Sequence, residues 1–233
     1  MLSFRTLLTT VLAVSVVAQQ KLELNKASLE EAMKYASETM AMQDAKFTLI
    51  VQGGAVNVIL GDRPTTADMD FIATDYKPDD PNSYKDGTLQ KLKRAWLLAA
   101  ADVANSPHPI PRDWVDSSIS ALFFGNAELF QKFKSQAILQ NEVLSTAGMD
   151  TDGTGIKYIA APWEWQIVRK LGVPKRKEYD HSDAAFCLRQ WLKMNNKESV
   201  HFDDLAGMFQ SWHIPVPKNL AEMCMTVMML GLA

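Results

Sequence analysis

Two aspartates one residue apart, Asp68 and Asp70, follow a glycine pair, Gly53 and Gly54, in the stretch GGAVNVILGDRPTTADMDFIATD. Residues i and i+2 of a strand point to the same face, so the two carboxylates would project together. Mg²⁺ in proteins is commonly held by one or two carboxylates together with substrate phosphates. The pair therefore indicates either a magnesium site or the solvated start of an ordinary strand.

The residues between the glycines and the aspartates suit an anionic ligand. Gly53 and Gly54 carry no side chains, so a phosphate can approach the backbone of a helix that begins there. Arg63 and Thr66 could add charge-assisted or hydroxyl hydrogen bonds to the same anion. For Arg63 the alternative is an ion pair at the surface. With metal on the aspartates, these residues predict binding of a triphosphate, and two metal ions could clamp an in-line phosphoryl displacement.

Alternating segments place this stretch in a predicted sheet. Residues 46–54 form a β-branched run that ends in glycines, residues 55–61 favour a short helix, and residues 69–75 favour a second strand. Further elements are predicted as helices over 27–42 and 89–106, a strand or edge segment over 113–124, and a strand over 155–162.

The chain changes character after Pro162, where successive helical patterns begin. Together these patterns predict an α+β fold, with a mixed sheet flanked by helices over residues 27–162 and a helical C-terminal region over 163–233.

The order strand, Gly-Gly, short helix, Arg-x-Thr-Thr, Asp-x-Asp, strand resembles the first motif of the nucleotidyltransferase superfamily with a polymerase-β-like core. The resemblance implies Mg²⁺ on Asp68 and Asp70 and a nucleoside triphosphate as substrate. A nucleoside monophosphate would be transferred to an acceptor hydroxyl on a protein side chain, a small molecule or an RNA 3′ end.

A second segment, WQIVRKLGVPKRKEYDHSDAAFCL, resembles a helical motif in one branch of that superfamily. The branch includes toxin-like abortive-infection nucleotidyltransferases and bacterial and fungal relatives. The matching residues are Lys170, Arg176, Asp180 and Asp183, and the resemblance implies that Lys170 contacts a phosphate of the nucleotide. From their residue type and position, Asp180 and Asp183 are predicted to be caps and first-turn acids of a helix.

Active members of the superfamily usually carry a third carboxylate on a later strand, as a general base or metal ligand. The predicted strand GIKYIAAP contains no acid. Asp116 in DWVDSS is the candidate, and Asp152, in a glycine-rich loop, fits less well. The alternative function is therefore a catalytically inactive protein of this fold that acts by binding or interaction.

Composition limits the other classes. With 233 residues, 47% hydrophobic and 22% charged, the chain is typical of a soluble globular protein, and its net charge of −3 does not indicate a broad nucleic-acid surface. The histidines and cysteines lack the spacing of a zinc site. Cys187 and Cys224 could form a disulfide, but their apolar helical contexts favour buried thiols.

Residues 1–18 have one cation, an apolar run and small residues before Gln19, which predicts a signal peptide and hence the secretory pathway or the exterior of the cell. The apolar run is too short for a membrane span, which needs about 20 residues. The alternative is a buried N-terminal helix or a later translation start in a cytoplasmic protein.

Overall fold

A computed structural model describes residues 22–61, 63–80, 87–172 and 179–231. The predicted signal peptide over residues 1–18 and the motif residue Arg176 lie outside the described residues. Within the described part of the chain, no helix combines the length and the apolar character that a membrane crossing requires.

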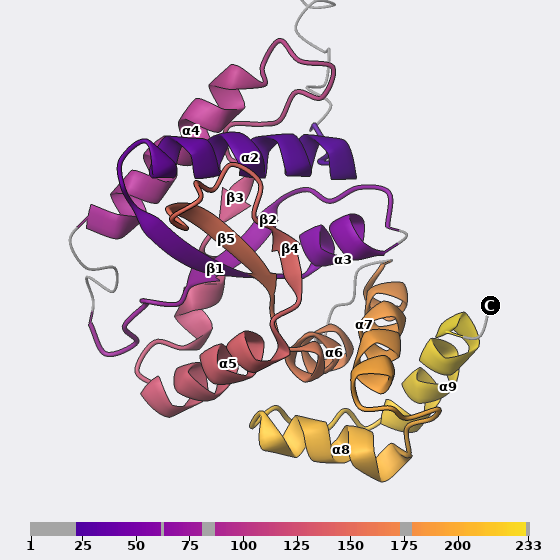
Figure 1. The fold of residues 1–233 in the computed structure, drawn as a ribbon. Helices are drawn as coiled ribbons and strands as arrows, with labels where there is room; N and C mark the ends of the chain where they lie inside the picture. Colours follow the sequence, from indigo (N-terminus) through magenta and orange to yellow (C-terminus); the bar gives the residue numbers. More distant parts are fainter. Residues whose placement is uncertain (1–21, 62, 81–86, 173–178, 232–233) are drawn as a thin grey trace, which may run out of the picture.

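A five-stranded mixed sheet with the strand order β3-β2-β1-β5-β4 lies at the centre of the fold (Figure 1). β1 (Lys46–Gln52) runs antiparallel to β2 (Met69–Ala73) and parallel to β5 (Gly155–Ala160). At the two edges, β3 (Val115–Asp116) pairs parallel with β2, and β4 (Val143–Ser145) pairs antiparallel with β5. The predicted α+β class is confirmed.

One side of the sheet is covered by α2 (Lys26–Ala41) and α4 (Thr88–Asp102), which pack against each other (Figure 1). The Phe71 ring of β2 contacts Trp96 of α4 at a centroid distance of 4.5 Å. Tyr158 of β5 donates a hydrogen bond to the Met33 carbonyl of α2 at 3.4 Å. Because these aromatic side chains are buried on this side, the alternate residues of the same strands face the other way.

The opposite side of the sheet meets η2 (Ser118–Leu122), α5 (Ala127–Gln140) and α6 (Trp163–Gly172). Trp165 of α6 is 2% exposed. Its ring contacts three other buried rings, those of Phe123, Phe133 and Trp212. This aromatic cluster fixes α6 beneath the sheet and thereby fixes the residues that α6 contributes to the site.

The helical C-terminal region is confirmed, since every described element after β5 is a helix. These are α6, α7 (Asp180–Met194), α8 (Phe202–Ser211) and α9 (Leu220–Gly231). α6 packs extensively against α7, and α7 packs against α9 (Figure 1). Cys187 of α7 and Cys224 of α9 are both buried free thiols, as their apolar contexts indicated.

The sequence was less informative at the two edges of the sheet. The segment predicted as a strand or edge segment over 113–124 contains the two-residue edge strand β3, and a 3₁₀ turn, η2, follows it. The three-residue strand β4 was not predicted at all. Both edge strands are too short to show an alternating pattern, so their conformation depends on pairing with β2 and β5 rather than on local sequence.

Candidate functional site

Polar side chains from three neighbouring strands share one face of the sheet. Asp70 on β2 is the cross-strand partner of Gln52 on β1 and of Asp116 on β3. Residues that are partners across a ladder point to the same side of the sheet. That side is the one facing α6, because the Gln52 side-chain carbonyl accepts a hydrogen bond from the Trp165 indole N–H at 2.8 Å.

Gln52 at the end of β1 and Asp70 of β2 line a pocket of about 290 Å³. The volume lies near the lower end of the range for small-molecule sites, about 300–1,000 Å³. The pocket combines the two carboxylates of the Asp-x-Asp motif with Gly53 and Gly54, called the glycine turn below, and with cationic side chains. Its lining consists of Gln52, Gly53, Gly54, Arg63, Thr66, Ala67, Asp68, Asp70, Gln166, Arg169, Lys170 and Asp180.

The glycine turn packs directly on Asp70. Gly53 has a φ of +74°, which a residue with a side chain rarely adopts, and a Cβ there would lie 3.3 Å from the Asp70 Oδ2 atom. The Gly53 N–H donates to the Gln166 side-chain oxygen at 3.1 Å, and the Gln166 amide donates to the Ala161 carbonyl at 3.1 Å. Gln166 therefore ties α6 to the turn and engages the Gly53 N–H that was expected to face a phosphate.

Gly54 begins the seven-residue helix α3 (Gly54–Leu60) and is closely surrounded. A Cβ at this position would lie 2.4 Å from the Thr66 hydroxyl oxygen and 3.0 Å from the Arg63 guanidinium carbon. The Thr66 hydroxyl donates to the Asp68 carbonyl at 3.1 Å. Glycine is therefore needed here because the loop that carries the aspartates folds back onto the start of α3.

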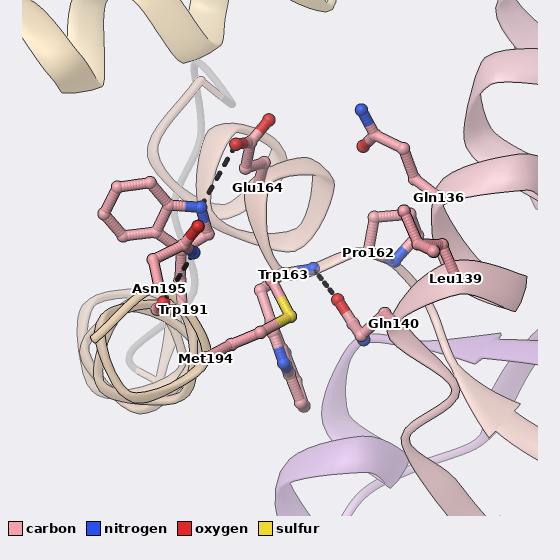
Figure 2. Close-up of a pocket in the computed structure, with 9 residues that line it drawn as sticks. All are labelled: Gln136, Leu139, Gln140, Pro162, Trp163, Glu164, Trp191, Met194 and Asn195. Carbon is pink, nitrogen blue, oxygen red and sulfur yellow. Dashed lines mark hydrogen bonds between the residues drawn. The ribbon is translucent and has the colours of Figure 1, made fainter. Parts of the chain in front are cut away.

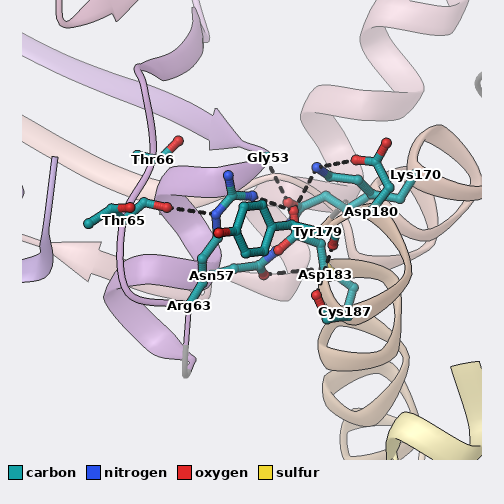
Figure 3. A network of polar contacts seen from close by, with 12 residues as sticks. Gly53, Asn57, Arg63, Thr65, Thr66, Lys170, Tyr179, Asp180, Asp183 and Cys187 are labelled. Atoms are coloured by element: carbon teal, nitrogen blue, oxygen red, sulfur yellow. Dashed lines mark hydrogen bonds and ion pairs between the residues drawn. The ribbon is translucent and has the colours of Figure 1, made fainter. Parts of the chain in front are cut away.

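Figure 3 shows a compact ion-pair network that includes the pocket residues Arg63, Lys170 and Asp180. Arg63 donates to Asp183 at 2.6 Å and to the Thr65 carbonyl at 2.8 Å. Lys170 lies 2.7 Å from the same Asp183 carboxylate and 3.0 Å from Asp180. The Asp183 side chain is 2% exposed, and the Arg63 and Lys170 side chains are 15% and 18% exposed. Two cations predicted to meet a phosphate are thus already paired with two carboxylates.

Burial and these partners act on Lys170 in opposite directions. Burial alone would lower the pKa of the Lys170 ammonium, but the charges and hydrogen bonds of Asp183 and Asp180 outweigh it, and the pKa is raised. Lys170 therefore carries its charge throughout the neutral range.

The prediction that Asp180 and Asp183 are helix caps was wrong in part. Both lie in the first turn of α7, as expected, but the N-cap position is Tyr179, and no side-chain capping hydrogen bond is made there by the described residues. The two carboxylates point instead to Lys170 and Arg63. Arg63 also lies over the Tyr179 ring at 4.7 Å. A pairing between residues 120 positions apart has no local signature in the sequence.

Arg169 is a pocket residue that the sequence did not single out. Arg169 lines the pocket because α6 packs with its last turn, which carries Arg169 and Lys170, toward Gly53 and Gly54. The guanidinium carbon lies 5.7 Å from the centre of the Trp165 ring. Burial lowers the pKa of Arg169, but an arginine remains charged at neutral pH. The only local signal was its position next to Lys170.

Of the two candidates for a third carboxylate, Asp116 on β3 lies directly beside Asp70 of β2 in the sheet. One Asp116 oxygen accepts from the Ser118 N–H at 2.7 Å and the other from the Ser118 hydroxyl at 2.8 Å. Among the described residues, no group of three acidic, histidine or cysteine side chains converges in the arrangement of a metal site. Asp116 therefore shares the face of Asp70 while its carboxylate bonds to its own loop.

Asp152 lies at the other end of the sheet. Its carboxylate accepts from the Thr154 N–H and hydroxyl, and the neighbouring Gly153 packs against Lys46. Lys46 begins β1 and Gln52 ends it, so roughly 20 Å of strand separates this loop from the pocket. Asp152 is excluded as a partner of Asp68 and Asp70 in this structure.

A second hollow, of about 390 Å³, lies between α5, α6 and α7 (Figure 2). Glu164, the charged residue among the described residues that line it, accepts a hydrogen bond from the Trp191 indole at 3.1 Å. The Gln140 side chain accepts from the Trp163 N–H at 2.9 Å. The described residues that line this hollow include no pair of carboxylates and no cation, so the Asp-x-Asp motif and the cations singled out above lie at the first pocket.

No family model, curated protein or solved structure matches the chain.

Proposed function

We propose that the protein is a Mg²⁺-dependent nucleotidyltransferase of the polymerase-β-like class, acting on a nucleoside triphosphate. One observation carries the proposal: Asp68 and Asp70 line the same pocket as the cations Arg63, Arg169 and Lys170. A divalent cation needs anionic oxygen ligands, whereas the phosphate chain needs cations and hydrogen-bond donors. A magnesium–triphosphate complex requires both kinds of group together.

The donor set fits Mg²⁺. Asp68 and Asp70 supply hard carboxylate oxygens, and glycine at position 53 brings no side chain of its own against Asp70, whose Oδ2 a Cβ there would approach to 3.3 Å. Mg²⁺ held there would offset the charge that builds up on the phosphate oxygens during transfer. Asp116, the strand neighbour of Asp70, would be the further ligand for a second ion if its carboxylate left Ser118.

The proposed reaction joins an acceptor oxygen to the α-phosphorus and breaks the bond between the α-phosphorus and the bridging oxygen, so that pyrophosphate leaves. The acceptor hydroxyl loses its proton to a base in this step. Asp116 is the candidate for that base because it lies on the same face as Asp70.

The second candidate function is nucleotide binding without transfer. The observation that favours it is the pair of hydrogen bonds from Ser118, which engage both oxygens of Asp116. In that case the pocket would bind the triphosphate through Asp68, Asp70 and the cations, and the protein would act through the bound state.

Transfer is tested by incubating the protein with each labelled nucleoside triphosphate, Mg²⁺ and a cell extract, and following label into protein, RNA and small molecules. We expect label in one class of acceptor, and its loss in Asp68→Asn/Asp70→Asn. The matched control is Asp150→Asn/Asp152→Asn, which removes a second Asp-x-Asp from the distant loop and should keep full activity.

Asp116→Asn separates the two candidates. Loss of labelling with intact triphosphate binding supports transfer with Asp116 as base or ligand. If wild-type protein binds the triphosphate but labels nothing, the binding function holds. Labelling that survives in Asp68→Asn/Asp70→Asn would contradict the site.

A further inference from the structure

Among the described residues that line the pocket, Arg169 differs from the other two cations, Arg63 and Lys170. Arg63 and Lys170 are each bonded to Asp183, and Lys170 also to Asp180. Within the described part of the chain, the Arg169 guanidinium makes no ion pair and no hydrogen bond. It makes a cation-π contact with the Trp165 ring. Among the described lining residues it is the cation whose charge neither Asp180 nor Asp183 neutralises.

The guanidinium is held in place rather than extended into solvent. Arg169 is partly buried in the pocket wall. The Trp165 ring beneath it is buried and hydrogen-bonded to Gln52 at the end of β1. A guanidinium that is partly removed from water interacts more strongly with an anion than an exposed one does. Its planar fork can also donate two parallel hydrogen bonds to a phosphate.

A structural role at the end of α6 is the competing explanation. Arg169 and Lys170 both lie in the last turn of α6, where cations stabilise the helix dipole. Lys193 occupies the same kind of position in the last turn of α7 but does not line the pocket. If Arg169 only stabilised the dipole of its helix, Lys193 would have the same role in α7. Binding of a ligand in the pocket, by contrast, would involve Arg169 and not Lys193.

We propose that Arg169 binds a phosphate oxygen of the nucleotide and makes the pocket selective for phosphorylated over unphosphorylated nucleosides. This inference rests on the proposed function, because the ligand is the triphosphate assigned to the pocket there. Arg63 and Lys170, by contrast, mainly position the loop and α7 through Asp183.

Calorimetry with a magnesium–nucleoside triphosphate and with the matching nucleoside tests this role. We expect Arg169→Gln to weaken triphosphate binding about tenfold to hundredfold, the range for loss of a charge-assisted hydrogen bond, and to leave nucleoside binding unchanged. Lys193→Gln, the helix-end control, should bind the triphosphate like wild type. Melting curves of each variant establish that it is folded.

Equal triphosphate affinity in wild type and Arg169→Gln overturns the role of Arg169 but leaves the proposed function standing. An equal loss of triphosphate and nucleoside affinity also overturns it, since that would be a structural effect. If wild type binds neither ligand, the proposed function itself fails. Should Arg169→Gln unfold, Arg169→Met decides, because it keeps an apolar stem against Trp165 without the charge. About tenfold weaker triphosphate binding supports the phosphate contact, and unchanged binding overturns it.

Discussion

Replacing Asp183 by asparagine tests the ion-pair network that holds the pocket together. The Asp183 carboxylate is 2% exposed and lies 2.6 Å from the Arg63 guanidinium and 2.7 Å from the Lys170 ammonium. Asparagine keeps the volume but removes the charge, which leaves two partly buried cations facing each other. Removing one partner of a buried ion pair costs about 3–5 kcal/mol, because the remaining charge is uncompensated.

Urea denaturation measures this loss of unfolding free energy. For a chain of this size the melting temperature would fall by about 6–20 °C, since each kcal/mol corresponds to roughly 2–4 °C. The control is Glu30→Gln, which removes an exposed pair with Lys26, 3.9 Å apart, and should cost at most about 0.5 kcal/mol.

The pH dependence gives a second measure. The pKa of Lys170 is raised above its ordinary value of 10.5, so the charged form is favoured in the folded state. Its contribution to stability is complete below the unfolded pKa, about 10.4, and is lost as the pH rises through the folded pKa. The penalty of Asp183→Asn should therefore be constant from pH 7 to 9 and shrink above about pH 10.5.

A loss below about 1 kcal/mol at pH 7, the size typical of an exposed pair, would refute the assignment of Asp183 as the charge that holds Arg63 and Lys170. A penalty that grows above pH 10.5 would contradict the sign argued for Lys170.

Two further predictions concern packing. Gly54→Ala should lower the unfolding free energy measured by urea denaturation by about 1–3 kcal/mol, because its Cβ would lie 2.4 Å from the Thr66 oxygen. The control, Gly207→Ala, has open space around it and should stabilise α8 by about 0.5–1 kcal/mol. Equal effects of the two changes would contradict the close packing around Gly54. Burial raises the pKa of the Cys187 and Cys224 thiols, so both should react slowly with a thiol reagent at pH 8 in the folded protein and rapidly after unfolding; fast reaction of the folded protein would count against their burial.

Local patterns in the sequence were sufficient for the main elements around the site. The β-branched run that ends at Gly53 and the apolar segment after Asp68 were both predicted to be strands. Both are present, as β1 and β2. Those two strands place Asp70 beside the glycine turn, so the first part of the pocket follows from local order alone.

The remaining features depend on contacts between distant segments. Asp183 and Arg63 pair only because α7 packs against α6 and reaches α3, and no helix-capping rule reveals that contact. Arg169 reaches the pocket because the aromatic cluster around Trp165 orients α6. Asp116 becomes the neighbour of Asp70 through a two-residue strand whose pairing is set by β2.

Binding of a magnesium–nucleoside triphosphate by Asp68 and Asp70 is the central claim, and calorimetry tests it most directly. Wild type and the Asp150→Asn/Asp152→Asn control should bind with the same affinity, and binding should require Mg²⁺. Asp68→Asn/Asp70→Asn should lose that Mg²⁺-dependent binding. Equal affinity in all three proteins, or no binding in any of them, would contradict the claim.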